Sequence, residues 1–202
     1  MKRLFALAAL LIPITAGCTL SINGGSDPRS LGLPHCRAAT ATGRDESRSG
    51  LLLMAQSVRT ATLLPCIKTL PIGWTFTRLD VTNQRARFWL DSDRAGHNAI
   101  RVTLDSRCDV GNTPAAKSTR PDVREYDQIS TATSGYSADR YFVFSGGCVT
   151  YHFNLRGAGS KAEMSSITAA LDFVTRADLA RSVRRYSHDR LDLDPTPSRS
   201  HP

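Results

Sequence analysis

The sequence predicts an α+β fold: one domain with an antiparallel sheet of about five strands, packed by helices near residues 46–64 and 161–186 and stapled by two disulfides. Three observations favour this class. Short segments with alternating apolar side chains follow one another between residues 74 and 155, and segments with helical periodicity flank them. Four cysteines, Cys36, Cys66, Cys108 and Cys148, are spread along the chain. The chain has 202 residues, which suits one domain with a sizeable core.

The N-terminus has the pattern of a secretory signal peptide over residues 1–17. Two basic residues precede an apolar run at 4–15, and two small residues come directly before Cys18. The apolar run is shorter than the roughly 20 residues that a membrane-spanning helix needs. We therefore expect an exported chain that is cleaved before Cys18.

The residues TAGC at 15–18 resemble the lipobox of bacterial lipoproteins, in which the cysteine receives a diacylglyceryl group and becomes the new N-terminus. Thr15 departs from the commoner leucine at the first position. The resemblance implies lipidation of Cys18 with acyl chains such as palmitate, and a lipid-anchored position on the outer face of the cytoplasmic membrane. Two or more chains would hold the protein stably, since each buried CH₂ contributes about 0.8 kcal/mol. A plain signal peptide with an incidental cysteine is the alternative.

The chain is basic, with a formal charge of +8 that falls to +6 when Lys2 and Arg3 leave with the signal peptide. Its 22 arginines are scattered rather than clustered, and no stacking motif of the RNA-binding kind accompanies them. The sequence therefore does not predict a nucleic-acid partner. Attraction to anionic headgroups or cell-wall polymers is the milder consequence of a basic surface.

The first part of the mature chain is predicted to be a tether and a helix. Residues 18–43 are rich in Ser, Gly, Pro, Thr and Ala and lack periodicity, so we expect a flexible tether with a span of roughly 25–30 Å. The domain proper is expected at 44–186. Its first helix is predicted over residues 46–64, with Asp45 as N-cap and Pro65 as its end.

Five segments have the alternation typical of strands: 74–81, 86–90, 99–104, 140–144 and 149–155. The short connections between the first three predict an antiparallel meander. The last two flank Ser-Gly-Gly-Cys, a hairpin signal.

The stretch at 105–139 has few strong apolar residues, so we expect a long loop there, with a short helical turn near Glu125–Ile129 and a role in binding or as a lid. Two helices are expected after the last strand, at 161–174 and 177–186, and residues 187–202 are expected to form a disordered tail.

The cysteines that remain after lipidation are even in number, which predicts two disulfides in an exported protein. Their intervening lengths of 29, 41 and 39 residues do not resemble a zinc or thioredoxin site, so no metal and no cofactor is predicted. Four cysteines allow three pairings. We favour Cys36 with Cys66 and Cys108 with Cys148.

Cys148 and His152 raise the question of a cysteine nucleophile. Four residues along a strand place their Cα atoms about 13 Å apart, too far for a local pair. A histidine distant in sequence, His35 or His97, would have to serve instead. We prefer the disulfide, and we expect His152 to be half-exposed on the face opposite the apolar stripe.

The candidate ligand-binding residues are Asp91, Asp93, Arg94 and His97, in the polar stretch LDSDRAGH beside a strong strand. The two aspartates and the glycine resemble half of a calcium loop, but the later ligands are missing. Paired carboxylates also suit acid–base catalysis. A polar hairpin loop, in which an aspartate pairs with Arg94, is the alternative without a function.

Four blocks of the chain resemble those of a family of exported actinobacterial proteins with no assigned biochemical function. They are GWTF at 73–76, LDSDRAG at 90–96, CDVG at 108–111 and YFVFSGGCVTYHF at 141–153. The resemblance covers about residues 64–186. It implies an envelope location and a GC-rich bacterial source, and it transfers no catalytic residue.

The sequence therefore favours a non-enzymatic binding or accessory module at the cell envelope. Its partners would be the membrane, through the lipid, and an envelope protein, a lipid or a cell-wall polymer. The alternative is an envelope hydrolase or transferase that uses Asp91, Asp93 and His97.

Overall fold

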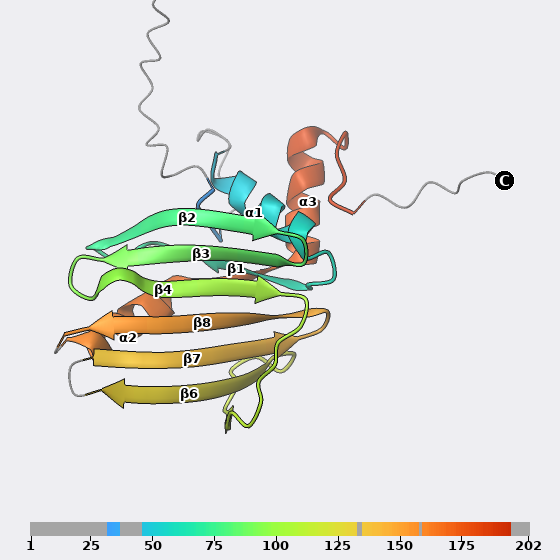
Figure 1. The fold of residues 1–202 in the computed structure, drawn as a ribbon. Helices are drawn as coiled ribbons and strands as arrows, with labels where there is room; N and C mark the ends of the chain where they lie inside the picture. The colour runs from blue at the N-terminus through green and yellow to red at the C-terminus, as the bar shows by residue number, and fades with distance from the viewer. Residues whose placement is uncertain (1–31, 37–45, 133–134, 158, 195–202) are drawn as a thin grey trace, which may run out of the picture.

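The computed structural model describes residues 32–36, 46–132, 135–157 and 159–194 (Figure 1). The expected signal peptide and the expected lipidation site at Cys18 lie outside these residues, as do most of the expected tether and the end of the expected tail. Within the described part of the chain, no helix is long and apolar enough to cross a membrane.

The described residues form an α+β domain whose sheet is antiparallel, as the sequence predicted. In chain order the elements are α1 (Glu46–Ser57), β1 (Leu63–Ile67), β2 (Trp74–Thr82), β3 (Arg85–Ser92), β4 (Gly96–Asp105), β5 (Ala115–Ala116), β6 (Arg124–Ala132), β7 (Gly135–Phe144), β8 (Gly147–Arg156), α2 (Ser160–Ala170), β9 (Leu171–Thr175) and α3 (Arg176–Ser187). The main sheet has seven strands in the order β2-β3-β4-β8-β7-β6-β5, and β1 and β9 pair separately. The prediction of about five strands was too low.

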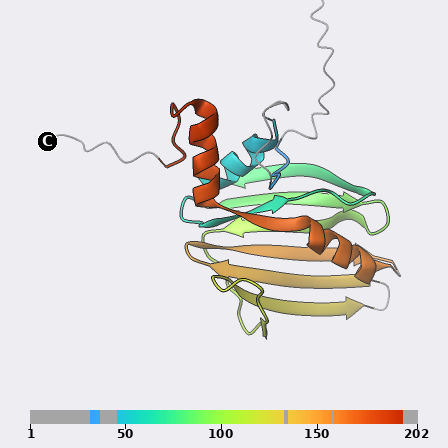
Figure 2. The same cartoon turned by 180° about the vertical axis from the view of Figure 1, so that it is seen from behind.

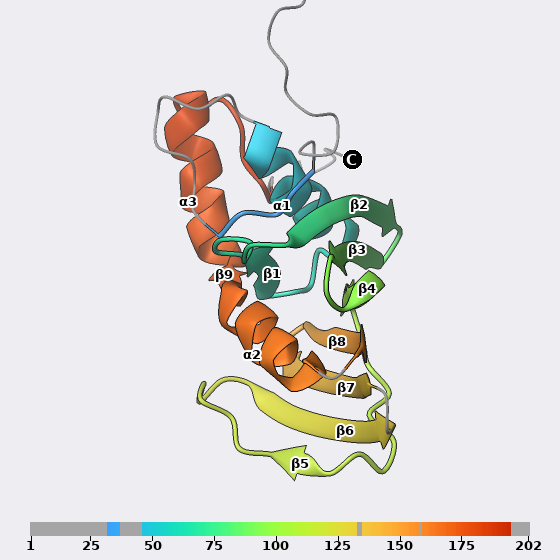
Figure 3. The same cartoon turned by 90° about the vertical axis from the view of Figure 1, so that its left-hand side faces the viewer.

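The second layer lies on one face of the seven-stranded sheet, which we call the inner face. Figure 3 shows α1, α2 and the β1–β9 ribbon together on that side, and Figure 2 shows α2, β9 and α3 from behind. The inner face carries the largest fully buried side chains of the sheet, among them Phe88, Leu90, Ile100, Val102 and Phe153. The opposite, outer face is the one on which no described helix packs.

The segment Leu171–Thr175 is a strand, not the end of a helix as expected. Its register pairs it with β1, and Phe173 stacks on Tyr151 of β8 with ring centroids 6.3 Å apart. Phe142 and Phe144 of β7 meet the same ring edge-on. An extended backbone presents Phe173 to these three rings, and that packing outweighs the helical spacing of the apolar residues.

The expected helix at 46–64 is also shorter than predicted, because α1 ends at Ser57 and Leu63–Ile67 forms β1. All five residues of β1 are buried, since the strand lies between the sheet and the helices. A short apolar run that is buried on both faces has no periodicity to separate strand from helix. Pro65 is tolerated because β1 pairs with a full strand, β9, on one side only, and on the other side it forms just an isolated bridge between Ile67 and His35.

The expected loop at 105–139 was wrong over its second half. Residues Arg124–Ala132 form β6, which pairs with β7 along its whole length, so the helical turn near Glu125–Ile129 does not form. β6 lies next to the two-residue strand β5 near the edge of the sheet, and its side chains are largely polar on both faces. A strand without a buried apolar stripe gives a weak alternation signal.

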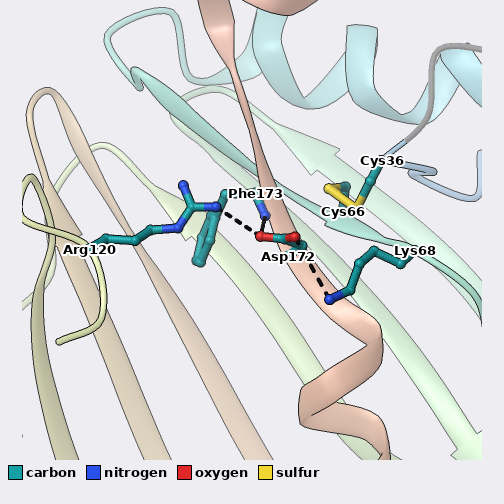
Figure 4. Close-up of a disulfide and its surroundings, with 6 residues drawn as sticks. All are labelled: Cys36, Cys66, Lys68, Arg120, Asp172 and Phe173. Carbon is teal, nitrogen blue, oxygen red and sulfur yellow. Dashed lines mark hydrogen bonds and ion pairs between the residues drawn. A yellow bond between two sulfur atoms is a disulfide. The ribbon is translucent and has the colours of Figure 1, made fainter. Parts of the chain in front are cut away.

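Both expected disulfides are present, Cys36–Cys66 with Cα atoms 4.9 Å apart and Cys108–Cys148 with Cα atoms 5.8 Å apart. The first ties residues 32–36 to β1, where the backbone N–H of Cys36 also donates to the carbonyl of Ile67 at 3.0 Å. Figure 4 shows it beside Asp172, whose carboxylate accepts from Arg120 at 2.9 Å. Closing loops of this size contributes about 3–4 kcal/mol each in the chain-entropy account.

The C-terminal helix α3 is capped at both ends. The Thr175 hydroxyl accepts from the backbone N–H of Asp178, and His188 ends the helix in the left-handed conformation. The chain then folds back, so that Leu193 is buried and Asp194 binds Arg176 through both carboxylate oxygens. Residues 188–194, expected as part of the tail, therefore pack on the domain.

Candidate functional site

The outer face of the sheet carries a row of polar and aromatic side chains that runs across the strands. The register places Arg78 of β2 opposite Trp89 of β3, and Trp89 opposite Arg101 of β4. Arg101 in turn lies opposite His152 of β8, which faces Asp139 of β7. Neighbouring strands are about 4.8 Å apart, so successive members of the row are in reach of one another.

Arg78 lies flat over Trp89, with its guanidinium carbon 3.8 Å from the centre of the indole ring. A second arginine, Arg87, approaches the same ring at 5.7 Å. Trp89 is only 8% exposed although it lies on the outer face. The stacking holds the Arg78 guanidinium in place and leaves its edge for an anion. A β-bulge between Phe76 and Arg78 makes this possible, because it leaves Phe76 on the inner face and turns Arg78 outward.

Three carboxylates of the outer face are already engaged. Asp80 accepts from Arg87 at 2.9 Å, and Asp105 accepts from Arg85 at 2.6 Å. Asp139 contacts Nδ1 of His152 at 2.6 Å.

Within the described chain, by contrast, the half-buried Arg101 has no hydrogen bond, ion pair or ring contact. Arg78 and Arg101 therefore lie on either side of Trp89, and neither forms an ion pair with a carboxylate of the described residues, although the charge of Arg78 helps to lower the pKa of Asp91.

Asp91 and His97, two of the predicted site residues, do come together at the β3–β4 turn. Oδ2 of Asp91 lies 2.8 Å from Nδ1 of His97, and Oδ1 accepts from the backbone N–H of Asn98 at 2.7 Å. Burial alone would raise the pKa of Asp91, but the bonds from His97 and Asn98 outweigh it and hold that pKa below its usual value. The His97 ring itself is 93% exposed.

Asp93 and Arg94, the other two predicted residues, are directed elsewhere. The backbone N–H of Asp93 donates to the carbonyl of Gly73 at 2.8 Å, and its exposed carboxylate has no hydrogen bond within the described residues. The guanidinium of Arg94 reaches Glu163 of α2 at 3.5 Å. Glu163 also accepts from the indole N–H of Trp74 at 2.9 Å, so it links α2 to the start of β2.

An open hollow of about 690 Å³ adjoins this turn. Its lining residues come from β2 and from the β3–β4 hairpin: Thr75, Phe76, Thr77, Asp91, Ser92, Asp93, Gly96 and His97. Asp91, Asp93 and His97 thus share one hollow. Across the described residues, however, no group of three His, Cys, Asp or Glu side chains is placed to hold a metal ion.

Cys148 is excluded as a nucleophile by its disulfide. Its side chain is 1% exposed, and its partner Cys108 also contacts the Thr150 hydroxyl at 3.6 Å. His152 is half-exposed on the outer face, as the alternation predicted, and it pairs with Asp139. The disulfide holds the segment after β4 against the outer face, where it crosses the sheet in Figure 1.

The cation pair around Trp89 was not predicted. Arg101 alternates with Ile100 and Val102, so the sequence indicates that its side chain points outward. The sequence does not indicate which side chains lie beside it. Arg78, Trp89 and Arg101 belong to three strands, and only the register across those strands brings them together.

Comparisons with known proteins do not place the chain in a family. No protein-family profile matches it, and no curated protein matches it. A solved structure from Bacteroides thetaiotaomicron is similar with a TM-score of 0.31 and 10% identity, over 57% of this chain and 46% of that one. A likeness at this level supports no conclusion about function.

Proposed function

We propose that the protein is an exported, lipid-anchored binding module that holds an anionic cell-wall polymer on the outer face of its sheet. The observation that carries the proposal is the pair of guanidinium groups, Arg78 and Arg101, on either side of Trp89, neither of which forms an ion pair with a carboxylate of the described residues. A planar guanidinium binds carboxylate or phosphate in a bidentate manner. A row across several strands suits an extended ligand better than a small compact one.

The location in this proposal rests on the N-terminal sequence and the disulfides. Residues 1–17 have the signal-peptide pattern and Cys18 stands in the lipobox position. The domain contains two disulfides, and disulfides form and persist in oxidising compartments. We infer that Cys18 is lipidated and that the domain faces outward from the cytoplasmic membrane.

An envelope hydrolase or transferase at Asp91 and His97 is the second candidate, favoured by their 2.8 Å contact in an open hollow. Two features argue for binding instead. The His97 ring is almost fully in water, where a general base gains nothing from desolvation, and Asp93 makes no bond to either residue. Asp91 and His97 are better suited to add polar contacts at one end of the outer face.

The test is co-sedimentation of the purified full chain, in non-ionic detergent, with isolated cell walls. We expect Arg101→Gln and Arg78→Gln each to weaken binding roughly tenfold, the effect of losing a charged hydrogen bond. Arg185→Gln, on α3 and away from the sheet, is the matched control because it removes the same charge from an exposed site.

Wall binding that is absent in the wild type, or that falls equally in Arg185→Gln, would contradict the proposal. Turnover of wall polymer that disappears in His97→Ala would favour the enzyme instead.

A further inference from the structure

A second hollow lies at the opposite end of the sheet from Asp91, where three turns meet the end of α1. Its volume is about 610 Å³, within the size range of small-molecule sites. Its lining residues are Gln56, Ser57, Val58, Arg59, Thr60, Asn83, Gln84, Ser106, Arg107 and Gly146. They come from the C-terminal end of α1, the β2–β3 turn, the end of β4 and the β7–β8 turn, which gather at the right-hand end of the sheet in Figure 1.

Hydrogen bonds to backbone carbonyls hold the walls of this hollow together. The Thr60 hydroxyl donates to the carbonyl of Gly146 at 2.5 Å, which joins the β7–β8 turn to the segment after α1. The N–H of Gln84 donates to the carbonyl of Ser57 at 2.9 Å, and the N–H of Ser106 donates to the carbonyl of Gln84 at 3.3 Å. The three turns are therefore fixed relative to one another, as a preformed site requires.

Four polar side chains around the hollow are left free for a ligand. Arg59, Arg107, Gln56 and Asn83 form no side-chain hydrogen bond or ion pair with any other described residue. The lining contains no Asp or Glu, in contrast with the hollow at Asp91. The charge of the site is therefore set by two guanidinium groups.

The surroundings leave these charges largely uncompensated. Arg59 helps to lower the pKa of Asp194, but that carboxylate is already held by Arg176. The C-terminal end of α1 would by itself repel an anion. Here the carbonyls of Ala55 and Val58 accept from the Arg176 guanidinium, which offsets the negative end of the helix.

We propose that this hollow binds the phosphate of a phosphorylated sugar or polyol. The guanidinium groups of Arg59 and Arg107 match a phosphate dianion, and the amides of Gln56 and Asn83 match the hydroxyl groups beside it. The site is separate from the cation pair at Trp89, so it goes beyond the function proposed above. The same chemistry is found in soluble sugar phosphates and in the headgroup of phosphatidylinositol.

The test is an NMR titration of the ¹⁵N-labelled full chain in non-ionic detergent with glucose 6-phosphate, glucose and a soluble short-chain phosphatidylinositol. We expect saturable shifts of the amides at 56–60, 83–84 and 106–107 with at least one of the two phosphate probes. The probe that binds more tightly identifies the source. Arg59→Gln and Arg107→Gln should each weaken binding roughly tenfold, whereas Arg185→Gln and Arg101→Gln should leave it unchanged.

Three outcomes would overturn the inference. Neither phosphate probe shifts these amides at millimolar concentration, glucose shifts them as strongly as glucose 6-phosphate, or Arg185→Gln weakens binding as much as Arg107→Gln. Arg101→Gln is expected to weaken wall binding and to leave this titration unchanged. The two experiments therefore test the wall-binding proposal and the phosphate-binding proposal separately.

Discussion

Replacing Gly146 by alanine should destabilise the domain far more than an ordinary glycine-to-alanine change. Gly146 has φ +75°, and a Cβ atom there would overlap the carbonyl oxygen of Thr60. The β7–β8 turn must then move away from the segment after α1. That movement breaks the hydrogen bond from the Thr60 hydroxyl, together with the two that the hydroxyl and the N–H of Thr62 donate to the carbonyl of Ser145.

The size of the effect follows from these three bonds. Each contributes about 0.5–1.5 kcal/mol, and the exposed ones belong to the lower end of that range. Gly111→Ala is the matched control, because Gly111 has φ +50° and a Cβ atom there would meet nothing within 4 Å. Both variants carry the left-handed cost of about 1 kcal/mol. The difference between them should therefore be about 2–3 kcal/mol.

The assay is equilibrium unfolding in urea, followed by tryptophan fluorescence with both disulfides intact. The free energies of unfolding of the two alanine variants are compared with each other and with the wild type. If they differ by less than about 0.5 kcal/mol, the size expected of an ordinary surface change, the packing of the β7–β8 turn against Thr60 does not have the role assigned to it. The same result would weaken the case for a preformed hollow at Arg107.

Two further predictions concern the Asp91 turn and the anchor. Because the pKa of Asp91 is lowered in the folded state, its contribution to stability is present above the unfolded value of about 3.9 and is lost as the pH falls through the folded value. The difference in free energy of unfolding between wild type and Asp91→Asn should therefore shrink as the pH drops from about 5 toward 2. A constant difference in acid unfolding curves would refute the pairing with His97. Cys18→Ala should leave the chain unprocessed or release it to the medium, measured by fractionation and mass, whereas unchanged detergent-dependent membrane association would count against the lipid anchor.

The strands that the sequence identified are those with one buried face. Ile100, Val102 and Leu104 alternate with polar residues because β4 separates the core from water, and the same holds for Val149, Tyr151 and Phe153 on β8. Where that asymmetry is missing, the signal is missing too. β1 is buried on both faces and β6 is polar on both, so the first two residues of β1 were assigned to a helix that ends at Pro65, and β6 was assigned to a loop.

Local sequence patterns also predicted only part of the candidate sites. Asp91 and His97 were found because they are six residues apart in one turn, and local polar clusters are visible in a sequence. Arg78 and Arg101 meet only through the register of three strands, and a bulge after Phe76 decides which way Arg78 points. Arg59 and Arg107 lie 48 residues apart and share a hollow only because three turns converge there. Contacts of this kind depend on tertiary structure that local patterns do not contain.

The two hollows are best treated as separate sites because of the length of β3. Its eight residues separate the hollow at Asp91 from the hollow at Gln84, a length of about 25 Å. The first end presents carboxylates and an imidazole, whereas the second presents guanidinium and amide groups. A ligand of the size of a sugar phosphate contacts only one of them. Only a polymer of several units, lying along β4 past Arg101, would contact both, and this is why isolated cell walls and a single sugar phosphate are needed as separate probes.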